Sequence, residues 1–333
     1  MLDIPLWAWA ALAAVIVTML AIDLLAHRKV HIIGFAEAAR WSAVWVGVSI
    51  VFAIVVTMTL GTTAGVEFTT AWLLEKSLSV DNLFVFALIF AYFKVPREYQ
   101  HRVLFYGVIG ALFFRAIFIA LGVAVVSRFT AVLFVFAAIL LYSAYKLLKD
   151  DDEQFDPGTS FAVRALRRIV PVQDEYEGTK FFVRRAGKLV ATPLLAVVVA
   201  IEAADIVFAV DSVPAVLAVS DDPFIIYSSN AFAILGLRAL YFLLAGLLHR
   251  FHYLSKGLAL ILAFIGVKLT LQAAHKTIDT SIPEIPPLVS LAVIVIVLTI
   301  SITLSLTRPP HPHPHEAVEA GGDGTEAETT PRR

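Results

Sequence analysis

Two apolar stretches of the sequence each carry two acidic residues six positions apart. Glu75 and Asp81 lie in EKSLSVD, and Asp205 and Asp211 lie in ADIVFAVDS. Each ionised side chain at bilayer depth costs about 2.5 to 3.5 kcal/mol on insertion scales, so such residues are usually functional and face a protein interior. Carboxylate oxygens are ligands that hard cations prefer. The two stretches therefore predict a cation site inside an apolar environment.

The predicted metal site combines these acids with neighbouring side chains that carry oxygen. Such ligands suit Mg²⁺, Ca²⁺ and Mn²⁺, whereas copper favours Cys or Met and zinc favours His or Cys. The chain has no cysteine and only three methionines, which argues against soft metals. The residues alone do not choose between the hard ions. The predicted ligands are Glu75, Asp81, Asn82, Glu202, Asp205, Asp211 and Ser212.

Basic residues in the same apolar segments offer a second interpretation, in which the acids form internal ion pairs. Arg115 and Arg238 are central in their segments, and Lys268 lies in another. Asp23 and His27 are four residues apart near the end of the first segment, which fits either an entrance site for a divalent ion or ordinary interfacial polar residues. We predict that these five residues line the ion pathway or act as charge partners.

Helix geometry limits how the paired acids can cooperate. Positions six apart on an ideal helix are separated by about 120° around its axis. Glu75 and Asp81 therefore either address different neighbours or lie in a helix that unwinds between them. Pro214, three residues after Asp211, predicts a break in the helix that carries the second pair. Broken helices commonly coordinate cations in transporters.

The segments that hold these residues have the composition of membrane helices. The chain of 333 residues is 59% hydrophobic, has a mean hydropathy of +0.83 and is only 16% charged. Apolar runs long enough to cross about 30 Å of hydrocarbon lie near residues 6–26, 41–60, 69–93, 103–126, 131–148, 191–219, 226–248, 256–275 and 286–307. The predicted fold class is all-α: a polytopic membrane bundle of about nine transmembrane helices.

Three consecutive helices are predicted to occur twice. The acid pairs match each other, and Arg115 then matches Arg238, and Lys146 matches Lys268, in the same order. Because three is an odd number, the second unit enters the bilayer from the opposite face, which gives an inverted repeat. Secondary transporters are commonly built in this way, with their sites near the midplane where the units meet.

Charge distribution predicts the orientation and the organisation of the chain. Basic residues concentrate in alternate gaps, so the positive-inside rule places the N-terminus outside and the C-terminus in the cytoplasm. Residues 150–188 form a predicted loop that begins with acidic residues, ends with basic residues and favours a short hairpin. The Pro- and Glu-rich tail, residues 308–333, is predicted to be disordered. The predicted units are two N-terminal transmembrane helices (1–68), the first three-helix repeat (69–149), a cytoplasmic loop (150–190), the second repeat (191–276), a last transmembrane helix (277–307) and a cytoplasmic tail (308–333).

Three stretches resemble the TerC family of integral membrane proteins, including its Alx branch: EKSLSVDNLFVF, TPLLAVVVAIEAADIVFAVDSVPAVLAV and DPFIIYSSNAFAILGLRALYFLLAG. The likeness runs from about Asp23 to Thr307. It implies a bacterial inner-membrane protein, linked by family name to tellurium resistance and, through relatives, to manganese export and metal homeostasis. Manganese is favoured only through this resemblance. The acidic motif of the family carries over onto Glu75, Asp81, Asn82, Asp205, Asp211 and Ser212.

The sequence therefore favours an exporter of divalent metal cations, Mn²⁺ first among them, with no permanent cofactor. Two alternatives remain open: an exporter of amino acids or other small solutes, and a membrane-stress or tellurite-resistance scaffold that binds a cytoplasmic partner through residues 150–188. A homo-oligomer is compatible with either. No basic stripe predicts a nucleic-acid partner. No nucleophile–base pair, phosphate loop or zinc motif predicts an enzyme.

Overall fold

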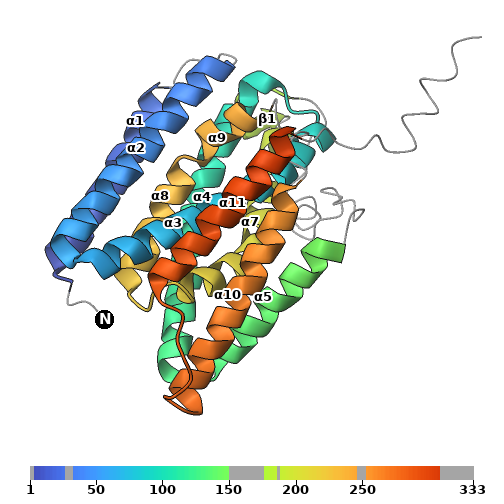
Figure 1. The fold of residues 1–333 in the computed structure, drawn as a ribbon. Helices are drawn as coiled ribbons and strands as arrows, with labels where there is room; N and C mark the ends of the chain where they lie inside the picture. The colour runs from blue at the N-terminus through green and yellow to red at the C-terminus, as the bar shows by residue number, and fades with distance from the viewer. Residues whose placement is uncertain (1–3, 27–32, 150–175, 186–187, 246–252, 308–333) are drawn as a thin grey trace, which may run out of the picture.

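The structure is a computed structural model that describes residues 4–26, 33–149, 176–185, 188–245 and 253–307. His27, residues 150–175 and the predicted tail 308–333 lie outside the described residues. The described part is a bundle of helices with one two-stranded hairpin (Figure 1). Its helices are α1 (Leu6–Ala26), α2 (Phe35–Leu60), α3 (Thr62–Tyr92), α4 (Arg97–Arg128), α5 (Val132–Lys149), α7 (Pro193–Leu217), α8 (Pro223–Leu235), α9 (Leu237–Leu244), α10 (Leu254–Thr277) and α11 (Pro287–Thr307).

The all-α membrane bundle predicted from the sequence is confirmed. Among the described residues, seven helices are long and apolar enough to cross a membrane, or eight if the bent pair α8–α9 is one span. Each of the nine predicted segments contains a helix, and the described part of the seventh is formed by α8 and α9. The remaining segment is α3. Its charged residues exclude it from the helices that are apolar enough to cross a membrane. Nine membrane crossings therefore stay a prediction.

Helix α3 lies in the middle of the bundle, which explains how it tolerates charge. It contacts α2, α7, α8, α9, α10 and α11, and Glu75 is completely buried. With 31 residues, α3 is about 46 Å long, so it exceeds the hydrocarbon thickness. Because protein surrounds α3, its polar side chains face neighbouring helices instead of lipid.

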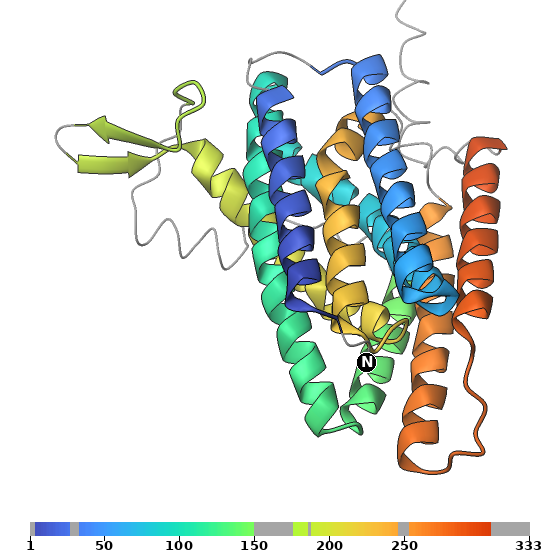
Figure 2. The same cartoon turned by 90° about the vertical axis from the view of Figure 1, so that its left-hand side faces the viewer.

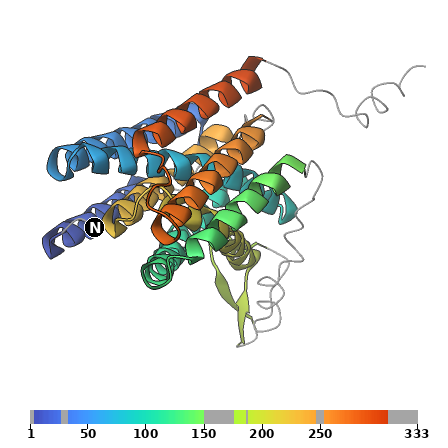
Figure 3. The same cartoon turned by 60° about the horizontal axis from the view of Figure 1, so that its bottom comes forward.

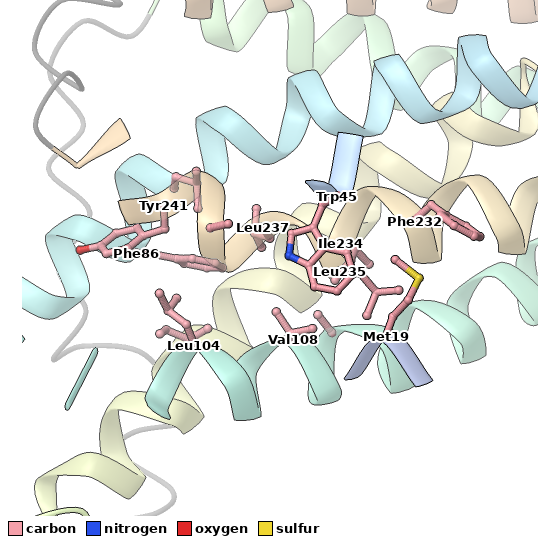
Figure 4. Packing of buried hydrophobic residues seen from close by; sticks show 14 of the residues in the cluster. Met19, Trp45, Phe86, Leu104, Val108, Phe232, Ile234, Leu235, Leu237 and Tyr241 are labelled. Atoms are coloured by element: carbon pink, nitrogen blue, oxygen red, sulfur yellow. The ribbon is translucent and has the colours of Figure 1, made fainter. Parts of the chain in front are cut away.

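The bent span forms where α8 ends and α9 begins, at Gly236, with an angle of 41°. A helix end leaves carbonyl groups without partners. Lys76 of α3 compensates one of them, because its ammonium donates to the Ala233 carbonyl at 2.9 Å. A Cβ at Gly236 would lie 2.8 Å from Lys76 Nζ and 3.2 Å from Trp45 Cβ, so glycine permits this close approach. Figure 4 shows Trp45 beside Ile234 at the bend.

The predicted break at Pro214 is wrong. Helix α7 runs without interruption from Pro193 to Leu217 and contains Pro214. Proline removes one backbone donor, but here it lies in the last turn, so the helix ends three residues later and little of the hydrogen-bond ladder is affected. The broken helix is α8–α9 instead. There Gly236 permits the close approach of Lys76, and Lys76 donates to the Ala233 carbonyl at the end of α8.

Two apolar clusters form the interior, and charged residues lie between them on two helices. The first cluster includes Ala111 of α4 and Ala204 of α7, and part of it appears in Figure 4. The second includes Ile119 of α4 and Ala209 of α7. Arg115 falls between the two clusters on α4, and Asp205 falls between them on α7. The helices therefore place their ionisable groups at one level of the bundle.

Contacts between the two predicted units follow an exchange pattern. Helix α5 of the first unit packs extensively against α10 of the second, and α3 contacts α7. Helix α3 also packs on α8, while α7 packs on α4. If the two predicted units are exchanged, α3 takes the place of α7, α4 of α8 and α5 of α10. The contact between α3 and α8 then becomes the contact between α7 and α4, and the other two contacts are unchanged, as expected for a repeat. The inverted orientation and the unit boundaries stay predictions.

The hairpin consists of β1 (Phe182–Arg185) and β2 (Lys188–Ala191), which pair antiparallel with Phe182 opposite Ala191. It corresponds to the hairpin expected in the loop and continues to Ala191, directly before α7. The strands extend beyond the helices, at the opposite end of the bundle from the connection between α10 and α11 (Figures 2 and 3). This end is the one that the predicted orientation places in the cytoplasm.

We expect Gly266→Ala to lower the apparent unfolding midpoint and Gly47→Ala to maintain or raise it. A Cβ at Gly266 would lie 2.9 Å from Leu141 Cγ, whereas nothing lies within 4 Å of one at Gly47. Alanine is intrinsically favoured over glycine in a helix by about 1 kcal/mol. Thermal unfolding of both purified variants in detergent measures the difference. Equal midpoints would contradict close packing of α5 on α10.

Candidate cation site

Arg115 of α4 joins the first acids of the two predicted units. Its Nη1 pairs with Oε1 of Glu75 on α3. Its Nη2 donates to Oδ1 of Asp205 on α7 at 3.0 Å, and its Nε donates to Oδ2 at 3.3 Å. This two-pronged geometry is the strong form of an arginine–carboxylate pair. None of the three residues is more than 3% exposed, so one buried guanidinium ties α3, α4 and α7 together.

Glu202 lies one turn before Asp205 on α7, and its two carboxyl oxygens are buried without a hydrogen-bond partner. A Cβ at Gly110 would collide with this carboxyl group, so Glu202 lies directly against the backbone of α4. It also experiences repulsion from Asp205. Because Arg115 is already occupied by two acids, a third carboxylate here needs a cation or a proton to balance it.

The second acids of the two units bind serines of the opposite units. Ser255 on α10 donates to Oδ1 of Asp81 at 3.2 Å, and Ser143 on α5 donates to Oδ1 of Asp211 at 2.6 Å. Acids six residues apart on α3 therefore address different neighbours, while the helix between Glu75 and Asp81 stays intact. Sequence reasoning missed both serines, because no local pattern distinguishes them from other serines in apolar helices.

The remaining predicted residues occupy three different environments. Asn82 is buried on α3, and the Ser212 hydroxyl is buried without a hydrogen-bond partner on α7. Arg238 on α9 pairs with the Asp23 carboxylate and donates to the Asp23 carbonyl at 3.1 Å. The contacts of Asp23 therefore fit the role of charge partner. Lys268 lies in a separate place, beside a cavity of about 430 Å³.

The predicted ligands do not converge on one point. In the part of the chain that the structure describes, no three His, Cys, Asp or Glu side chains are grouped closely enough to hold a metal ion. Instead, Glu75 and Asp205 share Arg115, Glu202 adjoins them, and each second acid is held by a serine. A divalent ion that used these carboxylates would have to compete with the Arg115 guanidinium for them.

Comparison with known proteins gives a match to the integral membrane protein TerC family over residues 60–311, which includes both predicted units. The chain belongs to the TerC family. The resemblance seen in the acidic stretches therefore extends through the helices that hold Arg115, Arg238 and Lys268. It also establishes a multi-pass integral membrane protein.

Similar proteins come from bacteria and are matched over most of their length. "Uncharacterized membrane protein STKORF319" of Myxococcus xanthus is 43% identical over 287 residues, which cover 86% of this chain and 88% of that protein. "Putative membrane-bound redox modulator Alx" of Salmonella typhi is 43% identical over 296 residues, covering 86% and 89%. The protein of the same description in Escherichia coli K12 is 42% identical, covering 86% and 90%. No solved structure matches the chain.

We expect Arg115→Gln to destabilise the protein strongly, because it leaves two buried carboxylates unpaired. Removing one partner of a buried ion pair typically costs about 3 to 5 kcal/mol. The triple variant Arg115→Gln, Glu75→Gln, Asp205→Asn should recover much of the lost stability, since it removes the charges together. Arg128→Gln, at an exposed position on α4, is the control. Thermal unfolding in detergent tests all three, and a stable single variant would contradict the shared ion pair.

Proposed function

We propose that this TerC-family protein transports divalent metal cations, Mn²⁺ first among them, out of the bacterial cell across the plasma membrane. The observation that carries the proposal is the excess of buried carboxylates around Arg115. Glu75 and Asp205 already bind the guanidinium, and Glu202 adjoins them with both oxygens free of hydrogen bonds. A purely structural ion pair would not need this third acid.

Charge balance favours a divalent ion. If Glu75, Asp205 and Glu202 are ionised, three negative charges face the one positive charge of Arg115, and two remain unbalanced. One divalent cation neutralises them. Between transport events, Arg115 keeps Glu75 and Asp205 paired, so that neither is left as an isolated charge in the apolar interior. An arriving ion replaces part of this pairing.

The type of ion follows from the donor atoms. The acids, Asn82 and Ser212 offer oxygen only, which suits Mn²⁺, Mg²⁺ and Ca²⁺ more than copper or zinc. The choice of Mn²⁺ and of outward transport rests on the resemblance to the family. The Alx relatives are described as redox modulators, and transport of a metal ion is compatible with that description. A thiol mechanism is not, within these 333 residues, because they contain no cysteine.

We expect Glu202→Gln, Asp205→Asn and Asp211→Asn each to reduce Mn²⁺ flux in proteoliposomes at least about ten-fold, the rate ratio that corresponds to roughly 1.4 kcal/mol. Each substitution removes a negative charge from the apolar interior while it keeps the side-chain shape. Glu98→Gln, at an exposed carboxylate on α4, is the matched control and should retain wild-type flux.

The same assay tests the choice of ion with Mg²⁺, Ca²⁺, Zn²⁺ and Fe²⁺ in place of Mn²⁺. Thermal unfolding of each variant ensures that a lost flux does not reflect lost protein. If the folded wild-type protein moves none of the five ions, the transport proposal is wrong and the scaffold alternative gains support.

The proposed orientation places the α5 end at Lys149 in the cytoplasm and the α7–α8 connection outside. A topology reporter fused after Lys149 should therefore read cytoplasmic, and one fused after Asp222 should read extracytoplasmic. Both results reversed would show that the orientation is the opposite of the proposed one. Both reporters on the same side would eliminate the proposed inverted relation of the units.

A further inference from the structure

A polar cavity of about 430 Å³ lies at the end of the bundle away from the hairpin. It is lined by the start of α3, the α7–α8 connection, the second half of α10 and the α10–α11 connection. Figure 2 shows the α10–α11 connection and the hairpin at opposite ends. In the proposed orientation the cavity opens outside the cell, and it is separate from the group around Arg115.

Acidic residues outnumber basic residues in the lining of this cavity. Four acids, Glu67, Asp221, Asp222 and Glu284, face one lysine, Lys268. Two of the acids have local structural roles. Asp221 pairs with Lys276 at 2.6 Å outside the lining, and Asp222 accepts the Phe224 amide at 2.9 Å as the cap of α8.

Glu67 and Glu284 are the acids with capacity left for a ligand. Glu67 accepts the Ser220 hydroxyl at 2.6 Å through Oε2, and its Oε1 accepts no hydrogen bond from the residues that the structure describes. Glu284 is exposed in the connection before α11. Both side chains contribute hard oxygen atoms to a space with ample volume for an ion and its water shell.

Lys268 is an unusual residue for the wall of such a cavity. It is only 6% exposed, and it makes no direct hydrogen bond or ion pair with any residue that the structure describes. Its charge is balanced at longer range by Glu67, Glu284 and Asp221. A buried ammonium without a direct partner is costly. The positive charge of Lys268 therefore depends on the acids of the cavity, and it partly neutralises their negative charge.

Gln272 provides an independent indication of a ligand. It lies one turn after Lys268 on α10 and lines the same cavity. Its Oε1 atom is buried and has no hydrogen-bond partner. Buried acceptors are normally satisfied, and a rotation of the Gln272 side chain would let this oxygen accept a hydrogen bond from the water shell of an ion in the cavity.

We propose that this cavity is a release site for a hydrated divalent cation and that Lys268 weakens the affinity of that site. The proposal rests on the transport function proposed above and adds a place and a cause for release. An ion near Glu67, Glu284 and Gln272 shares the carboxylates with the lysine and is repelled by it. After the ion leaves, the ammonium again balances the acids. The ion keeps its water, because the described carboxylates do not form a chelating group.

The absence of native cysteine permits a local binding assay. A nitroxide attached at Thr63→Cys, in the cavity lining, is broadened by Mn²⁺ that binds nearby. A second label at Tyr92→Cys, at the other end of α3, is about 44 Å away along the helix and reports non-specific effects. Titration of the full-length purified protein with Mn²⁺ then gives a Kd for the cavity without requiring transport.

We expect Lys268→Gln to tighten this Kd about ten-fold, the change that corresponds to roughly 1.4 kcal/mol, and Glu67→Gln to weaken it. Lys268→Arg keeps the charge and should bind as the wild type does. Lys256→Gln removes one charge from an exposed position on the same helix and should have no effect. Equal Kd values for wild type and Lys268→Gln would overturn the role of the lysine.

The two proposals can fail separately. If the wild-type protein transports Mn²⁺ but no broadening occurs at Thr63→Cys, the release site is wrong and the transport function stands. If Mn²⁺ broadens the Thr63→Cys label with the predicted dependence on Lys268 but no ion is transported, the cavity binds cations and the transport function is wrong. Equal broadening at both labels would overturn the cavity site, because it would show non-specific binding.

Discussion

The arrangement of the membrane helices depends on the buried guanidinium of Arg115. Glu75 and Asp205 come from helices that are far apart in the chain, and each would be an isolated charge in an apolar interior without it. One arginine pairs with both carboxylates and thereby links α3 and α7 to α4, while Glu75 Oε2 has no hydrogen bond of its own. The single positive charge of Arg115 already faces two carboxylates, so Glu202 adjoins this group as a third buried acid whose oxygens have no hydrogen-bond partner.

A charged helix in a membrane protein requires protein on all sides, and α3 meets this condition. Its neighbours supply Arg115 for Glu75, Ser255 for Asp81 and a free carbonyl of the bent span for Lys76. Glu75, Lys76 and Asp81 therefore each have a partner on a different helix. On α7, Asp205 and Asp211 likewise reach α4 and α5, whereas the Glu202 oxygens have no hydrogen-bond partner. Asp81 and Asp211 each accept a hydrogen bond from a serine of the other predicted unit, so these contacts link the two predicted units.

Two groups of ionisable residues in the described part of the chain differ in their access to solvent. The group around Arg115 is enclosed by the two apolar clusters, whereas Lys268 and Glu67 border an open cavity at one end. In both places a basic side chain of the protein lies among more acids than it can neutralise. In the proposed function, the basic side chain would therefore compete with a bound cation for the acids in both places.

The sequence by itself determined the all-α membrane class, the family and the acids at membrane depth, because apolar length and the types of residue are local properties. Tertiary structure alone decided which partner each acid received. The spacing of Glu75 and Asp81 fixes their angle around α3 but not which helices pack there, so the role of Ser255 was invisible. Packing also decided that the chain bends at Gly236, where Lys76 binds a free carbonyl, and not at Pro214, whose position in a last turn perturbs little.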